Sequence, residues 1–140
     1  MKIAMKVHLA SNSTQLVDRE LLRELVEAIG IDDYRLLLDS LSGEVDILTT
    51  DLLAKAAANE ERGFRSGAHR LAGLLAQFGA IEAATEAERL HHGETGGDLQ
   101  RLAASLRDLC RASLTTIMDV CATLGQPQQH HVVQFARASA

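Results

Sequence analysis

Apolar residues recur every three or four positions along most of the chain, a spacing typical of amphipathic helices. The pattern predicts a first helix that begins near Val17 and ends at Ile29, with Gly30 as its stop signal. It predicts a second, long helix capped by Asp32 or Asp33. The apolar face of this second helix consists of Tyr34, Leu37, Leu38, Leu41, Val45, Leu48, Leu52 and Leu53.

The second half of the chain predicts further helices. One is capped by Asn59 and runs to about Phe78, and the next extends from Ile81 to about His91. The glycine-rich stretch 92–97 (HGETGG) is the clearest loop of the chain. A long last helix follows the loop, from about Asp98 to Leu124. Helices of this length joined by short loops favour an all-α, antiparallel helical bundle.

The two ends of the chain lack this pattern. Residues 1–15 alternate apolar and polar side chains as a strand does, but no partner strand is visible, so we expect a flexible arm. Residues 125–140 are mostly polar and are expected to form a loose tail. The helical domain is therefore assigned to residues 16–124.

Composition narrows the classes of function. Of the 140 residues 46% are hydrophobic but only 3% are aromatic, which predicts one compact core of Leu, Ala, Val and Ile. A net charge of −5 argues against nucleic acid as the main partner, since phosphate backbones select basic surfaces. No stretch approaches the roughly 18 apolar residues of a membrane span. Cys110 and Cys121 fit buried thiols in a reducing compartment. We expect a cytoplasmic monomer that binds neither nucleic acid nor membranes.

One histidine stands out on the helix that follows Asn59. On a helical wheel of about 100° per residue with Phe64 as the origin, a buried stripe is formed within about 40° by Ala68, Leu71, Leu75 and Phe78. His69 falls about 140° away from Phe64. It shares that opposite face with Arg62, Ser66, Gly73, Ala76 and Gln77, with Arg65 at the edge. The helix is therefore expected to present His69 to solvent or to a partner.

Small residues and arginines surround this histidine. Gly73, one turn after His69, leaves room for another protein to approach the imidazole, at a cost to the helix of about 1 kcal/mol relative to alanine. Arg65, one turn before His69, can place positive charge near an anion on the ring. Arg70 points more than about 90° away and is expected to matter less. Gln77 is a candidate orienting group.

The segment from Ala68 to Ala80 (AHRLAGLLAQFGA) resembles the signature of histidine-containing phosphotransfer domains. That family's pattern has His, any residue, Leu, Lys, Gly and a small residue, with a second Gly near the helix end. The chain matches it at His69, Leu71, Gly73 and Gly79. The resemblance covers about residues 16–124 and implies an antiparallel four-helix bundle with an additional N-terminal helix.

The resemblance also implies a function. His69 would accept a phosphoryl group from the phosphoaspartate of a receiver domain and relay it to another receiver aspartate in a bacterial multistep phosphorelay. The implied partners are the receiver domains of a hybrid histidine kinase and of a response regulator, which supply Mg²⁺. The chain would need no cofactor or metal of its own, and it has no GxxxxGK[ST] loop, so no kinase activity is expected.

In this scheme Arg65, Arg70 and Gln77 would support the phosphoryl group. The docking surface would consist of Arg62, Ser66, Gly73 and Ala76.

Two alternatives stay open at this point. Ala72 and Leu74 stand where the family has Lys and a small Ser, which motivates an adaptor that binds receivers without being phosphorylated. Glu88 and His91 have the Glu-x-x-His spacing of di-iron helical bundles, which motivates a metal-binding bundle. Such sites need a second copy of the spacing, and only this one is visible. The simpler interpretation of this helix is a solvated acidic face formed by Glu82, Glu86 and Glu88.

Overall fold

The computed structural model describes residues 15–93 and 97–125, and these residues form five α-helices and no β-strand. The helices are α2 (Arg19–Ile29), α3 (Ile31–Ala57), α4 (Glu61–Gln77), α5 (Ile81–His91) and α6 (Leu99–Leu124). The prediction of an all-α fold is therefore confirmed. The predicted arm, the predicted tail and the middle of the predicted loop lie outside the described residues, apart from residues 15 and 125 at their inner ends.

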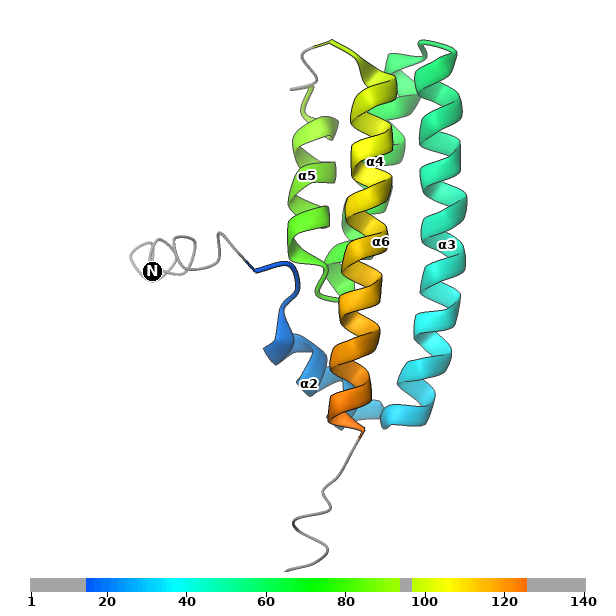
Figure 1. Ribbon diagram of the computed structural model, residues 1–140. Helices are drawn as coiled ribbons and strands as arrows, with labels where there is room; N and C mark the ends of the chain where they lie inside the picture. The colour runs from blue at the N-terminus through cyan, green and yellow to red at the C-terminus, as the bar shows by residue number, and fades with distance from the viewer. Residues whose placement is uncertain (1–14, 94–96, 126–140) are drawn as a thin grey trace, which may run out of the picture.

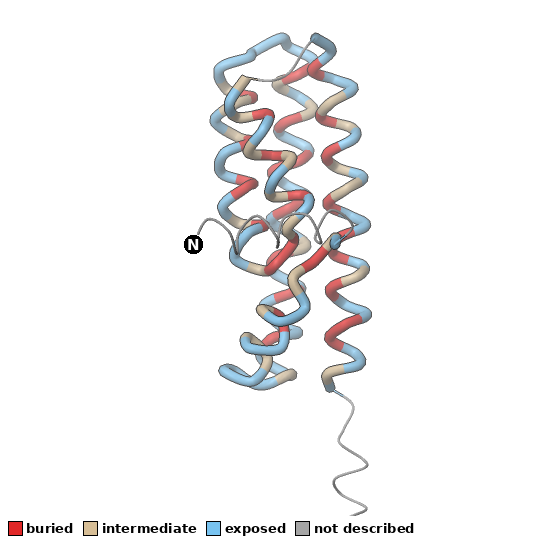
Figure 2. Tube along the Cα trace, turned by 90° about the vertical axis from the view of Figure 1, so that its left-hand side faces the viewer, coloured by how far each residue is buried: buried red, intermediate tan, exposed pale blue. Residues whose placement is uncertain are grey.

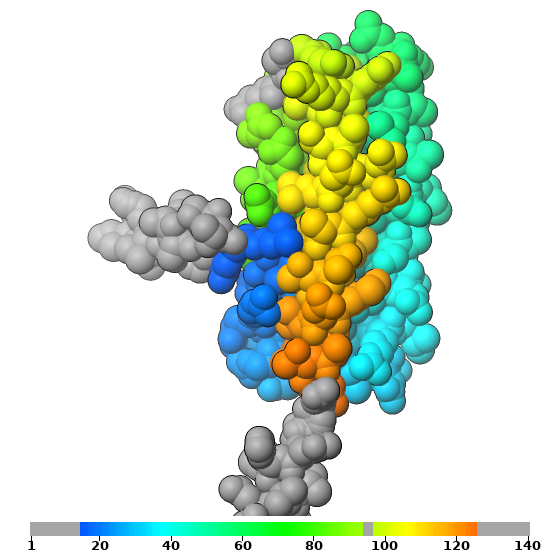
Figure 3. All heavy atoms as spheres, viewed as in Figure 1, coloured from blue at the N-terminus to red at the C-terminus, as the bar shows by residue number. Residues whose placement is uncertain are grey.

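Four of the helices lie side by side, and successive helices in the order α3, α4, α5 and α6 run in opposite directions (Figure 1). α4 packs against α3 and α5, and α6 packs against the same two helices. The short α2 crosses the lower end of the molecule, where it contacts α3 and α6. In the space-filling view α6 runs down the front, between α3 on one side and α5 and α2 on the other (Figure 3).

The core lies between these helices, with buried positions recurring on the inward side of each (Figure 2). The stripe predicted for α4 is confirmed at Phe64, Ala68, Leu71 and Leu75, which are all 0% exposed. Its last predicted member, Phe78, is only half-buried, because it lies just after the helix end as the C-cap. Leu37 is a correction: it was predicted to face the core but is 44% exposed. Its neighbour Leu38 takes the inward position instead, about 100° around the helix.

The junction between α2 and α3 differs from the prediction. Gly30, with φ of 92°, ends α2 as expected, and α3 begins at the next residue. Asp32 and Asp33 therefore lie inside the first turn of α3, and the prediction that one of them caps it is wrong. A glycine at positive φ turns the chain within a single residue, so no separate cap is needed. The two carboxylates interact favourably there with the helix dipole.

Asn59 ends α3 rather than capping α4, whose N-cap is Glu60. The φ of Asn59 is 59°, its N–H donates to Ala56 O (3.1 Å), and the Glu60 N–H donates to Lys55 O (2.9 Å). This pair of bonds is a Schellman motif, in which asparagine tolerates the left-handed conformation. The predicted cap is therefore wrong, although the predicted helix is present. The bounds of the last two helices agree with the prediction, with Asp98 as the N-cap of α6.

The turn between α4 and α5 is held by Gly79. With φ of 80° it occupies the left-handed position of a second Schellman motif, in which the Ala80 N–H donates to Leu75 O (3.0 Å). The carbonyl of Gly79 also accepts a bond from the Asp18 N–H (2.8 Å), just before α2. A Cβ at this position would lie 3.3 Å from Asp18 O. Both the backbone conformation and this close approach therefore favour glycine.

Cys110 and Cys121 on α6 are free, buried thiols. Burial raises the pKa of the Cys110 thiol to about 12 and also raises that of Cys121, which the charge of nearby Arg35 partly offsets. We expect both thiols to be alkylated by iodoacetamide at pH 8 far more slowly in the folded protein than in guanidinium.

The same shift predicts a loss of stability in alkali. In the unfolded chain the thiols ionise at a lower pH than in the folded protein. Their contribution to the free energy of unfolding is therefore complete below about pH 8.5 and falls as the pH rises above it. Urea midpoints measured from pH 8 to 10.5 should decline, and less steeply for Cys110→Ala than for the wild type. Equal slopes for the two proteins would contradict this role of Cys110.

Candidate functional site

The outward face of α4 is as the sequence predicts. The side chain of His69 is 64% exposed. The other residues predicted on or near this face are also exposed, apart from Arg65, which is half-buried: Arg62, Ser66, Arg70, Gly73, Ala76 and Gln77. α4 therefore buries one side in the core and leaves its histidine accessible.

Beside His69, an open hollow of about 540 Å³ lies between α4 and α5. We call this hollow the α4–α5 groove. A Cβ added to Gly73 would meet nothing within 4 Å, so no internal contact of the fold requires glycine there. Any larger side chain at that position would project into the groove or its rim. The groove is lined by His69, Ala72, Gly73 and Ala76 of α4 and by Ala84, Thr85, Glu88, Arg89 and His92 next to them.

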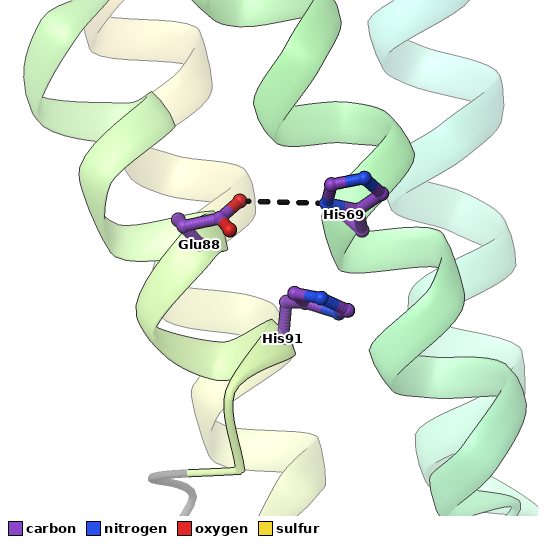
Figure 4. Close-up of side chains that lie close together, drawn as sticks. All are labelled: His69, Glu88 and His91. Carbon is purple, nitrogen blue, oxygen red and sulfur yellow. Dashed lines mark ion pairs between the residues drawn. The ribbon is translucent and has the colours of Figure 1, made fainter.

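Glu88 connects the two walls of the groove (Figure 4). Its Oε1 lies 3.5 Å from Nδ1 of His69, and its Oε2 lies 3.1 Å from Nε2 of His92. The ring of His91 stacks near His69, with ring centroids 4.5 Å apart. We call His69, Glu88, His91 and His92 the His–Glu cluster. The acidic face predicted for α5 is thus only partly solvated, because Glu88 contacts two histidines.

His91 is the best-anchored member of the cluster. It is half-buried, and its Nδ1 lies 3.2 Å from the backbone carbonyl oxygen of Arg65. A carbonyl only accepts hydrogen bonds, so the Nδ1 of His91 donates, and in the neutral ring the free lone pair belongs to Nε2. The backbone of α4 therefore fixes both the tautomer and the orientation of this imidazole.

The predicted docking residues and the supporting residue Arg65 lie in two hollows, and the other two supporting residues, Arg70 and Gln77, line neither of them. Arg62, Arg65 and Ser66 line a second hollow of about 570 Å³, together with Glu61 and His91. The guanidinium of Arg65 pairs with Glu61 and packs against Gly93. Gly73 and Ala76 instead line the α4–α5 groove. The structure thus divides the predicted docking surface between two hollows on either side of the cluster.

Four residues near His69 were not predicted to lie there: Glu88, Arg89, His91 and His92. One sequence signal could have found them. His69 and Glu88 lie at nearly equal separations on either side of Gly79, and antiparallel helices joined by a tight turn bring such positions face to face. Arg89, which pairs with Glu86, also brings a guanidinium to the rim of the groove.

Comparison with protein-family models, with curated proteins and with solved structures found no match to this chain. Within the described residues, no helix is both long enough and apolar enough to cross a membrane.

Proposed function

We propose that this chain is a histidine phosphotransfer protein in which α3–α6 are the four-helix bundle and α2 is the additional helix. His69 accepts a phosphoryl group from a receiver-domain phosphoaspartate and passes it to another receiver aspartate. The observation that carries the proposal is the placement of a 64%-exposed histidine in an open groove beside a glycine that the fold does not need. Such an imidazole is accessible to a second protein.

The transfer itself needs a nitrogen lone pair that points outward. When Nδ1 of His69 carries the proton and faces Glu88, the lone pair is on Nε2. Nε2 attacks phosphorus, the N–P bond forms as the bond to the aspartate oxygen breaks, and the aspartate leaves as a carboxylate. Glu88 stabilises the positive charge that the ring gains, as the carboxylate beside a catalytic histidine does. The reverse sequence returns the phosphoryl group, and the receiver supplies Mg²⁺.

The proposal is tested by incubating the full chain with phosphorylated receiver domains from the source organism. We expect at least one receiver to lose its label while the chain gains acid-labile, alkali-stable phosphate, which mass spectrometry should locate at His69. A receiver that binds tightly without transferring label would overturn the proposal in favour of the non-phosphorylated adaptor.

Gly73→Leu should block receiver docking without unfolding the protein. Leucine favours a helix over glycine by up to about 1 kcal/mol, and the new side chain meets no atom of the fold at its Cβ. The free energy of unfolding should therefore hold or rise while the receiver affinity falls at least about tenfold, the equivalent of 1.4 kcal/mol. Titration calorimetry with the receiver and urea unfolding measure the two effects.

Gly43→Leu is the matched control, since a Cβ at Gly43 of α3 also meets nothing within 4 Å. It should leave the receiver affinity unchanged. If Gly73→Leu also binds the receiver like the wild type, the docking face lies elsewhere.

A further inference from the structure

The His–Glu cluster contains more ligating groups than phosphoryl transfer uses. His69, Glu88 and His91 each offer one ligand atom, and these atoms all lie within 4.8 Å of one another. They come from the neighbouring helices α4 and α5, and the three side chains lie close together, with Glu88 facing His69 (Figure 4). The sequence offers only Glu88 and His91 as an alternative metal pair, because His69 is distant from them in the sequence.

We propose that His69, Glu88 and His91 form a binding site for a single Zn²⁺ ion. Two imidazoles and one glutamate are a donor set that zinc uses in proteins, with the fourth position left open to water. Ligand distances of about 2.0–2.2 Å in a tetrahedral site place the ligand atoms about 3.4 Å apart, so atoms that lie up to 4.8 Å apart must approach by as much as about 1.4 Å. The exposed side chains of His69 and Glu88 can make this adjustment by changing rotamer.

The contact of His91 with the backbone supports this assignment independently. Histidines that bind metals usually donate their second ring N–H to a carboxylate or a backbone carbonyl, which fixes the tautomer. The Nδ1 of His91 is placed in this way on the carbonyl of Arg65, at 3.2 Å. Its Nε2 is therefore already the nitrogen that a metal would take.

Zn²⁺ suits this site better than the Mg²⁺ of a phosphotransfer reaction. Imidazole nitrogen is a good ligand for zinc, whereas Mg²⁺ prefers oxygen ligands and retains its water. Among divalent ions, zinc also binds nitrogen and oxygen sites more tightly than Mn²⁺ or Fe²⁺.

Bound zinc would remove the nucleophile from His69. If the metal takes Nε2, the lone pair is used directly, and if it takes Nδ1, the remaining proton must sit on Nε2. Zinc and the phosphoryl group therefore exclude each other on this imidazole, a consequence that rests on the proposed function. The binding of zinc itself does not rest on it.

Zinc binding is tested by titrating the untagged full chain with Zn²⁺ against a chromophoric chelator, in the absence of any receiver. The wild type should bind one ion tightly, and excess Mg²⁺ should not displace it. His69→Ala, Glu88→Ala and His91→Ala should each weaken binding at least about tenfold, the lower end of the loss seen when a mere supporting residue of a metal site is removed. Circular dichroism checks that each variant keeps its helix content.

Two controls separate this site from other histidines and carboxylates. Glu82→Ala changes an exposed glutamate of the same helix and should bind like the wild type. The double variant His130→Ala/His131→Ala removes two histidines that are adjacent in the C-terminal sequence, and it should also bind one zinc ion tightly. Loss of the ion in this double variant, or equal binding by the three ligand variants and the wild type, would overturn the site.

A chemical probe then tests His69 without any phosphotransfer. Diethyl pyrocarbonate acylates imidazole through its free lone pair, and peptide mass spectrometry reads each histidine separately. Saturating Zn²⁺ should slow modification of His69 and His91 severalfold, because the metal occupies their lone pairs, while His130 reacts at an unchanged rate. Unchanged modification of His69 in zinc would exclude it as a ligand. Because this readout needs no receiver, it can fail or succeed independently of the proposed function.

Discussion

Replacing His69 by glutamine is expected to abolish acid-labile phosphorylation of the chain and to change its melting temperature by no more than a few degrees. The side chain is 64% exposed, and substitutions at such positions usually cost less than about 0.5 kcal/mol. Its contact with Glu88 is also exposed and is worth under about 1 kcal/mol. Glutamine keeps a polar amide but has no nucleophilic ring nitrogen. Transfer of radiolabel from a phosphorylated receiver measures the first effect, and a thermal melt measures the second.

The matched control is His130→Gln/His131→Gln, which removes two histidines that lie outside the described helices. This variant should be labelled like the wild type. Equal labelling of His69→Gln would end the phosphotransfer proposal at this residue. A loss of several kcal/mol in His69→Gln would show that the histidine is structural.

Phe64→Ala is expected to lower the free energy of unfolding by about 3–5 kcal/mol, the usual cost of removing a buried phenylalanine. The Phe64 side chain is 0% exposed and is one of the two largest fully buried side chains of the described core. Single domains are stable by about 5–15 kcal/mol, so this substitution alone brings the protein close to unfolding. Urea denaturation followed by circular dichroism measures the change.

Arg70→Ala on the same helix provides the comparison, because Arg70 is exposed. It should change the free energy of unfolding by less than about 0.5 kcal/mol. If both variants unfold at the same urea concentration, the division of α4 into a core face and an outward face is wrong.

The two faces of α4 could be predicted because they depend only on the period of the helix. Phe64, Leu71 and Leu75 return to the same side every three or four residues, and the 0% exposure of all three follows from that spacing. The exposure of His69 follows from the same geometry. The buried face of this helix and the accessibility of its histidine could therefore both be predicted from the sequence.

The ends of the helices were harder to predict because the same residue types favour different positions. Asparagine is common both before a helix and, in the left-handed conformation, just after one. Asn59 occupies the second position, since its N–H and that of Glu60 bond back to the carbonyls of α3. Asp32 and Asp33 likewise favour either a cap or a first turn, and the backbone of Gly30 decides between them.

The His–Glu cluster could not be predicted from motifs because its members are brought together by tertiary structure. Glu88 and His91 are close in sequence, but their nearness to His69 depends on the register between α4 and α5. That register is set by the turn at Gly79, which in turn is bonded to Asp18. One residue added to this turn would rotate α5 by about 100° and carry Glu88 away from His69.

The helices have unequal lengths, so one end of the molecule lies away from the groove. α3 has 27 residues and is about 40 Å long, whereas α5 has 11 residues and is about 16 Å long. α3 and α6 therefore extend beyond the groove, and α2 packs on this extension at the lower end (Figure 1). Ala122 lies exposed there, near the end of α6. A surface anchor attached at position 122 would hold the protein by this lower end and leave the groove free to meet a partner.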